Sequence, residues 1–284
     1  DWSYDGTTAL LMNGTSIRSV NLISGRMTPW HHIPSNLTGL PNVAFTGKSN
    51  LDVLATGFGD RPLVLNLNGQ IQARVTGGDI NGLALMGPSG PDGATLLLNP
   101  LDDQPLDHLW SAQGRLLAHS SVPPGSTSCN IVGYISGRHI VANCAQEGPS
   151  GGAALFEETP RGQVVRQLTP WLNAQSSSQL LNYLGAVQVG HALFAQVAGA
   201  CGTLYLTSIS PLLRQSIVSI GHGFDQSSLE VNGVSQRAIG ITASQGCAMG
   251  SSFLWYYPAT GRVVVGAGPP ATGGSVANVV LFHH

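Results

Sequence analysis

The segment Phe-Leu-Trp-Tyr-Tyr-Pro-Ala-Thr-Gly-Arg-Val-Val-Val, residues 253–265, contains a pattern that recurs along the chain. An apolar run leads into a short polar turn that ends in Gly, then Arg or Gln follows, and a second apolar run begins. This order is typical of a β-hairpin, in which the apolar runs form the strands. Further copies occur at 20–27, 63–71, 109–117 and 154–165, and a degenerate copy without the glycine occurs at 204–218.

The turn glycines are regularly spaced. They are Gly25, Gly69, Gly114, Gly162 and Gly261, and the first four are separated by 44, 45 and 48 residues. The last interval, 99 residues, spans the degenerate copy and therefore contains two steps of about the same length. Hairpins that recur every 40 to 50 residues or so, in a chain without helical periodicity, predict a β-propeller.

We predict an all-β fold, a six-bladed β-propeller that forms a single domain over residues 1–284. The first repeat lacks its opening strand, and residues 275–282 have the length and composition to supply it. The C-terminal strand would then complete the first blade, close the ring and remove exposed sheet edges. The predicted blades are 275–282 with 1–34, 35–78, 79–124, 125–172, 173–223 and 224–270.

This arrangement resembles the six-bladed propellers of the TolB-like, NHL and YWTD group. The likeness rests on the number of repeats, the turn pattern and the opening Ser3-Tyr4-Asp5-Gly6, which is similar to the Ser-Pro-Asp-Gly turn of TolB-like blades. The chain departs from that turn because tyrosine replaces proline, and Asp-Gly recurs clearly only at 92–93. The resemblance implies an architecture, and one architecture hosts many functions.

Charged residues are scarce and nearly balanced. Lys and Arg number 12, Asp and Glu number 14, and together they make up 9% of the chain, against about a quarter in an average globular protein. The net charge of −2 argues against a basic surface for nucleic acid or for an anionic membrane. No segment is long and apolar enough to predict a membrane span.

Residues 167–213 contain no Asp, Glu, Lys or Arg. This stretch covers nearly the whole fifth repeat. Because the cores of protein interfaces are depleted of charge, we predict that the uncharged fifth blade binds another protein.

Four cysteines allow three pairings, and one pairing follows from a predicted hairpin. If Ser136 and Gly137 form its two-residue loop, Cys129 lies opposite Cys144 on the neighbouring strand. Directly opposed strand positions have Cβ separations that suit a disulfide. We therefore predict the bridge between Cys129 and Cys144.

A second bridge is predicted between Cys201 and Cys247, which follow small-residue turns at matching places in neighbouring repeats. The alternative is four reduced thiols in the core. Disulfides persist in oxidising compartments. Bridges would place the protein outside the cytosol, as a secreted, periplasmic or cell-surface protein.

Candidate binding residues follow the ends of predicted strands. In a propeller, the loops between second and third strands and between blades surround the axis on one face. Thr-Pro-Trp occurs twice there, at 28–30 and 169–171, and each tryptophan would either hold a sugar or a protein partner or fill the wedge between two blades. The candidates are Trp30, His31, His32, Asp79, Asp102, Asp103, Trp171 and His222.

The spacing of these residues predicts no metal site, cofactor or catalytic group. His31 and His32 are adjacent, so on a strand they point to opposite sides and cannot chelate one ion together. The same rule separates the carboxylates of Glu157 and Glu158. No phosphate-binding loop or nucleophile elbow is present.

We therefore predict a non-catalytic binding or scaffold propeller, either an accessory subunit of a protein complex or the sensor part of an envelope protein. The alternative is a propeller enzyme, a lyase or a glycan-acting hydrolase, with a site at the axial mouth. That site would contain His31, His222, Asp79 and Asp102.

Overall fold

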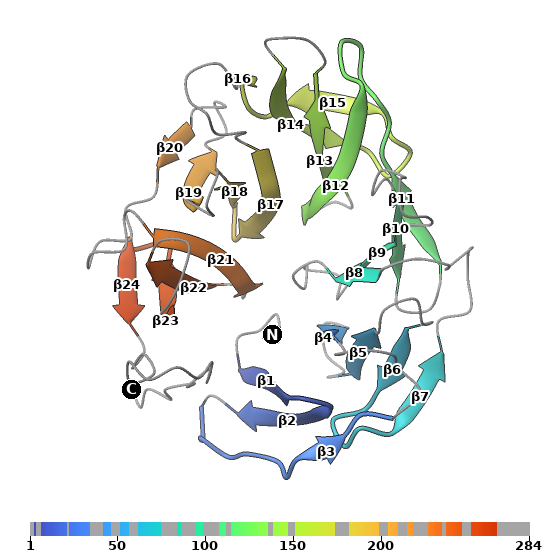
Figure 1. The fold of residues 1–284 in the computed structure, drawn as a ribbon, viewed down its shortest axis with the longest axis vertical. Helices are drawn as coiled ribbons and strands as arrows, with labels where there is room; N and C mark the ends of the chain where they lie inside the picture. The colour runs from blue at the N-terminus through green and yellow to red at the C-terminus, as the bar shows by residue number, and fades with distance from the viewer. Residues whose placement is uncertain are drawn as a thin grey trace.

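The structure is a computed structural model, and it describes residues 3, 7–21, 23–34, 42–46, 52–56, 62–74, 84–86, 95–98, 108–111, 115–135, 139–146, 151–173, 182–198, 204–209, 215–217, 227–234, 237–245 and 251–265. These residues form strands and turns and contain no helix. Figure 1 shows the sheets arranged around a common centre, which is the architecture of a β-propeller. The predicted all-β propeller fold is confirmed at this level. Within the same ranges there is no helix of the length and apolarity that crossing a membrane requires.

In the smaller sheets, each strand is hydrogen-bonded to the next strand along the chain. The first sheet contains β1 (Thr8–Asn13), β2 (Ser16–Asn21) and β3 (His31–His32). The second contains β4 (Asn42–Thr46), β5 (Asp52–Thr56), β6 (Leu63–Leu65) and β7 (Ile71–Arg74). The third contains β8 (Ala84–Met86), β9 (Thr95–Leu98), β10 (His108–Ser111) and β11 (Leu116–His119). The last contains β21 (Ser227–Val234), β22 (Ile239–Gln245), β23 (Ser251–Tyr257) and β24 (Arg262–Val265).

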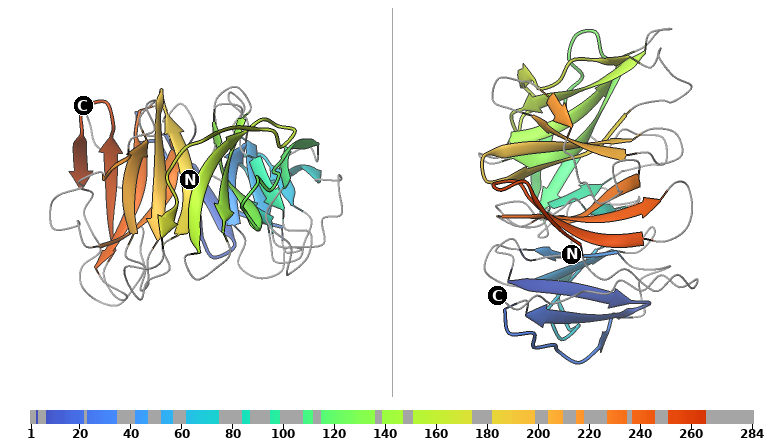
Figure 2. Two further views of the ribbon diagram at one scale, coloured as in Figure 1. Left: turned by 90° about the horizontal axis from the view of Figure 1, so that it is seen from above. Right: turned by 90° about the vertical axis from the view of Figure 1, so that its left-hand side faces the viewer.

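The large sheet joins two such meanders through their first strands. One meander contains β12 (Ser128–Ile135), β13 (His139–Ala145), β14 (Gly152–Glu158) and β15 (Val164–Gln167), with β16 (Leu172–Asn173) also paired to β14. The other contains β17 (Asn182–Val189), β18 (Ala192–Ala198), β19 (Leu204–Ile209) and β20 (Gln215–Ile217). The first strand of each meander lies nearest the centre in Figure 1, and the edge-on view in Figure 2 shows the inner strands crossing the thickness of the molecule.

Residues 253–265, in which the repeated pattern is clearest, form the hairpin of β23 and β24, where Tyr257 pairs with Arg262. The other copies of the pattern form hairpins in the same way. The turn glycines with a described conformation are left-handed, for example Gly69 with φ of 75° and Gly162 with φ of 72°. Residues with a side chain rarely adopt this conformation. The glycine is therefore the part of the repeat that the turn geometry requires.

The inner strands β12 and β17 touch at one point, where Gly133 pairs with Ala186 in parallel. A Cβ atom at Gly133 would lie 2.3 Å from the carbonyl oxygen of Ala186. A β-bulge precedes this glycine in β12, and bulges also precede Gly185 in β17 and Gly233 in β21. The repeated bulge and glycine bend the inner strands where neighbouring meanders meet.

The predicted pairing of Cys129 with Cys144 is confirmed, and the two residues form a disulfide. The predicted two-residue loop is wrong, however, because Ile135 pairs with His139 and leaves three residues between them. The bulge at Val132 adds one residue to β12 and shifts the register only between the bulge and the turn. The cysteines lie beyond the bulge and keep the predicted register.

The β17–β20 meander, which corresponds to the predicted fifth blade, is covered on both sides. Ala195 and Val197 pack on one side in a buried cluster with residues of the β12–β15 meander, including Leu155. On the other side, the Phe194 ring packs edge-to-face on Tyr256 of the last sheet, with centroids 5.9 Å apart. Burial between neighbouring sheets thus accounts for part of the missing charge in this stretch.

Gly133→Ala tests the close approach of the inner strands. We expect it to lower the free energy of unfolding by about 1–3 kcal/mol, because the added Cβ forces β12 away from β17. Gly185→Ala is the matched control, since its Cβ would meet only ordinary contacts at 3.7 and 3.9 Å. Urea unfolding of both variants gives the comparison, and equal losses would contradict this account of Gly133.

Candidate functional site

The first Thr-Pro-Trp, residues 28–30, lies immediately before β3. Proline has no N–H to donate to the strand ladder. Thr28 holds the strand instead, because its hydroxyl accepts the N–H of Ser19 at 2.9 Å and its own N–H donates to Ser19 O at 2.9 Å. These bonds keep the outer strand against β2 and set the position of Trp30.

The second Thr-Pro-Trp, residues 169–171, uses the same contact. The Thr169 hydroxyl accepts the N–H of Leu155 at 2.9 Å, and the motif leads into β16. The Trp171 ring then packs edge-to-face on Phe156, with centroids 5.8 Å apart, against the buried cluster that contains the disulfide. Trp171 thus fills space in an apolar cluster.

Trp30 has different surroundings. Its side chain is 41% exposed, and the Arg18 guanidinium lies 4.1 Å from the ring centre. Trp30 and Trp171 belong to different sheets, and the structure does not bring them together.

His31 and His32 lie on β3, the outermost strand of the first sheet (Figure 1). They pair with Ile17 and Ser16 of β2. His32 is exposed, and its Nδ1 lies 3.2 Å from the Thr15 hydroxyl. Both histidines are therefore at the edge of a sheet and away from the centre of the molecule. The remaining predicted residues lie outside the described part of the chain: Asp79, Asp102, Asp103, His222, Cys201 and Cys247.

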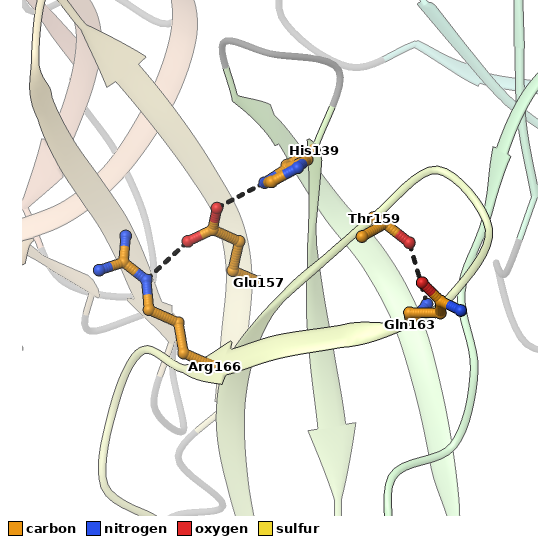
Figure 3. A network of polar contacts seen from close by, with 5 residues as sticks. All are labelled: His139, Glu157, Thr159, Gln163 and Arg166. Carbon is orange, nitrogen blue, oxygen red and sulfur yellow. Dashed lines mark hydrogen bonds and ion pairs between the residues drawn. The ribbon is translucent and has the colours of Figure 1, made fainter.

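Three ionisable side chains form a ladder across β13, β14 and β15 (Figure 3). Glu157 Oε1 lies 2.6 Å from His139 Nδ1, and Glu157 Oε2 accepts a hydrogen bond from Arg166 Nε at 2.7 Å. The strand register explains both contacts. Glu157 pairs directly with Arg166 of β15, and on the other side it pairs with Val141 of β13. His139 lies two residues before Val141 and therefore on the same face of the sheet. We call His139, Glu157 and Arg166 the charged ladder.

The carboxylate is the buried member of the charged ladder. The Glu157 side chain is 9% exposed, whereas those of His139 and Arg166 are 33% and 48% exposed. Burial raises the pKa of Glu157, but the hydrogen bonds and charges of His139 and Arg166 outweigh burial and hold the pKa below its ordinary value of 4.5. The carboxylate is therefore ionised at neutral pH.

Glu158 lies on the opposite side of β14 and is completely buried. Its Oε2 accepts the N–H of Ser121 at 3.0 Å, while its Oε1 has no hydrogen-bond partner. Burial raises the pKa of Glu158, and this effect exceeds the opposing effects of Ser121, the Ser120 hydroxyl and the charge of His119. The predicted separation of the two adjacent carboxylates is confirmed, and their environments are opposite.

Among the residues that the structure describes, the charged ladder has the parts of an acid–base pair but no nucleophile beside it. Glu157 orients His139 through Nδ1, as a carboxylate orients a catalytic base. Within the part of the chain that the structure describes, no hydroxyl or thiol is hydrogen-bonded to His139. Among the same residues, three potential metal ligands come together only at Cys129, Cys144 and Glu158, and there the sulfurs are joined in the disulfide.

The sequence analysis did not identify the charged ladder. A signal existed, because a hairpin whose turn includes Gly162 places Glu157 opposite Arg166 once the bulge in β15 is allowed for. His139 joins them through the regular pairing of β13 with β14, in which Val141, two residues after His139, lies opposite Glu157.

Glu157→Gln and Glu158→Gln should respond to pH in opposite directions. Glu157 has a lowered pKa, so its contribution is present above its unfolded pKa, near 4.5, and is lost as the pH falls. We expect Glu157→Gln to lower the free energy of unfolding by about 1–3 kcal/mol at pH 7, and to have little effect in acid. Urea unfolding at both pH values measures the difference.

Glu158 has a raised pKa, so its contribution is present below 4.5 and is lost as the pH rises through the raised value. Glu158→Gln should therefore raise the free energy of unfolding by about 1 kcal/mol at pH 7, because the amide avoids burying a charge. The gain should vanish in acid. Destabilisation by Glu158→Gln at pH 7 would show instead that the buried carboxylate is paired and ionised.

No family model matches the chain. No curated protein matches its sequence.

Solved structures of the same architecture do match the chain. The tricorn protease superposes with a TM-score of 0.52 at 14% identity, over 95% of this chain and 26% of that chain. Hydrazine synthase from Kuenenia stuttgartiensis superposes with a TM-score of 0.52 at 13% identity, over 89% of this chain and 74% of that chain. This chain thus spans about a quarter of the tricorn protease chain. At these identities the likeness shows the fold alone, and the fold is that of a β-propeller.

Proposed function

We propose that the chain is a six-bladed β-propeller, closed by residues 275–282, that acts outside the cytosol as a non-catalytic binding or scaffold module. It would serve as an accessory subunit of a protein complex or as the sensor part of an envelope protein. The observation that carries the binding role is the exposed apolar edge of β15.

The closure of the ring is supported by the first sheet, which among the described residues has three strands where every other meander has at least four. Among the described residues, β1 is hydrogen-bonded to β2 and has no strand on its other side. An apolar strand such as 275–282 fits that unpaired edge, because an open inner edge would otherwise invite pairing with other chains.

Removal of residues 271–284 tests the closure. If this segment completes the first sheet, its loss exposes apolar side chains and should lower the thermal midpoint by on the order of 10 °C. Removal of His283 and His284 alone is the control and should leave the midpoint unchanged. A truncated chain as stable as the full chain would contradict the closed ring.

The outer strand β15 presents apolar side chains to solvent. Val164 is 42% and Val165 is 48% exposed. The uncharged stretch 167–213 begins on the same strand, at Gln167. An exposed apolar edge next to a charge-free stretch has the composition of the centre of a protein interface.

The positions of the ionisable groups are compatible with a binding role. Within the described residues, the charged ladder lies on middle and outer strands, not at the centre, and His31 lies on an outer strand as well. An enzyme of this fold is expected to gather its ionisable groups in one pocket. The arrangement therefore favours binding over catalysis.

Site-specific photocrosslinking in the native source tests the binding role. A photoreactive amino acid at Val164 or Val165 should give a discrete crosslinked product, and mass spectrometry should find the same protein at both positions. Val122, which is 52% exposed but lies outside the strands, is the control and should give none. No product at β15, or the same products at Val122, would contradict a partner at this edge.

The disulfide supports a location outside the cytosol. Cys129 and Cys144 close a loop with a sequence separation of 15, and such bridges persist outside the cytosol. Free thiols at both positions in protein taken from cells would contradict this part of the proposal.

A further inference from the structure

Arg18 is fixed between Trp30 and Met27 without an oxygen acceptor among the described residues. Its guanidinium lies 4.1 Å from the Trp30 ring centre, and Nη1 donates to Met27 Sδ at 3.5 Å. A thioether is a weak acceptor, and a guanidinium carries five N–H donors. The Nε–H of Arg18 is buried and has no hydrogen-bond partner. A buried donor without a partner reduces stability, so this arrangement needs an explanation.

The second Thr-Pro-Trp provides an internal comparison. Because Thr28 bonds to Ser19 and Thr169 bonds to Leu155 in the same way, the residue that corresponds to Arg18 is Ala154. Ala154 is fully buried in the apolar cluster against which Trp171 packs. The Thr-Pro-Trp motif therefore needs no arginine at this position to form its structure. The guanidinium of Arg18 is a feature of the first sheet that the second copy of the motif lacks.

The surroundings of Arg18 are exposed and apolar. Met27, which contacts Arg18 through its sulfur, is 54% exposed, and Trp30 is 41% exposed. Tryptophan, methionine and arginine are the residues enriched at the centres of protein interfaces. A large apolar surface around an incompletely bonded cation indicates a ligand that supplies both an anion and an apolar group.

We propose that Arg18, Trp30 and Met27 form a carboxylate-binding site for an acidic segment of a protein partner. A carboxylate matches the fork of N–H donors on a guanidinium and can accept two hydrogen bonds in parallel. The unbranched Met27 side chain is flexible enough to move aside and admit an oxygen to Nε. An apolar side chain next to the acidic residue packs on Trp30.

A protein segment fits this site better than an acidic glycan. Met27 offers apolar surface, against which the hydroxyl groups of a sugar ring would lose water without gaining hydrogen bonds. The site is separate from the edge of β15, so its failure would leave the proposed function intact.

Selection from a phage-displayed library of random peptides on the full chain tests the site. We expect the selected peptides to be enriched in Asp or Glu next to a large apolar residue. Arg18→Met should weaken a synthetic copy of the best peptide by about ten- to hundredfold, because it removes charge-assisted hydrogen bonds. Arg26→Gln is the matched control: it removes one exposed charge in the same hairpin and should change the affinity less than about twofold.

The stability of Arg18→Met provides a second, independent measurement. Methionine keeps an unbranched apolar stem beside Trp30 and removes the buried donor, so the thermal midpoint should stay the same or rise. Loss of binding together with a lower midpoint would show that Arg18 is a structural residue. Peptides without acidic residues, equal losses for both variants, or binding of polygalacturonate in place of peptides would each overturn the proposal.

Discussion

The contact between Gly133 and Ala186 sets how closely neighbouring meanders can approach. Two inner strands meet there with no room for a Cβ atom, and the bulge before the glycine bends β12 toward its neighbour. Outside this point the sheets separate, and the space between them is filled by apolar side chains, such as Leu155 and Val197. The faces of a meander are then covered by other meanders, and solvent reaches mainly its turns and its outer strand. This geometry explains why so few charges are needed, and why most of the exposed large apolar residues, Met12 on β1 excepted, lie on outer strands, turns and loops.

The same geometry gives adjacent residues opposite chemistry. Glu157 and Glu158 follow one another on β14 but enter different spaces between sheets. One space contains His139 and Arg166, which lower the pKa of Glu157. The other offers the carboxylate of Glu158 a single backbone N–H on one oxygen and no partner on the other. A propeller strand can therefore hold, side by side, a carboxylate whose pKa is lowered and one whose pKa is raised, because no face of its sheet is simply the outside.

The fold could be predicted from the sequence because its signal is local and repeated. A glycine with a left-handed conformation fixes each hairpin, and the same residue order recurs wherever the turn recurs. The pairing of Cys129 with Cys144 followed from the expected register of a single hairpin. The loop next to them was predicted wrongly, because a bulge depends on a neighbouring meander that no local pattern reveals. The charged ladder was missed because it depends on register across three strands, and one extra residue in a strand changes which side chains meet. The surroundings of Arg18 were missed because they depend on which residues of the following segment lie beside β2. The two tryptophans of the repeated tripeptide look identical in sequence, and only their neighbours distinguish them.

Thr-Pro-Trp also shows how repetition separates folding from recognition. In both copies the threonine hydroxyl accepts a backbone N–H of the neighbouring strand. The tryptophan that follows is therefore not needed to hold the backbone. In one copy the partly buried ring packs on an apolar cluster, and in the other the exposed ring lies against Arg18, which stands where the first has Ala154. A chain built from equivalent units can change one of them at the periphery while the rest preserve the architecture. Specificity in such a molecule can therefore be altered by exchanging a few side chains in one unit, without redesigning the assembly around them.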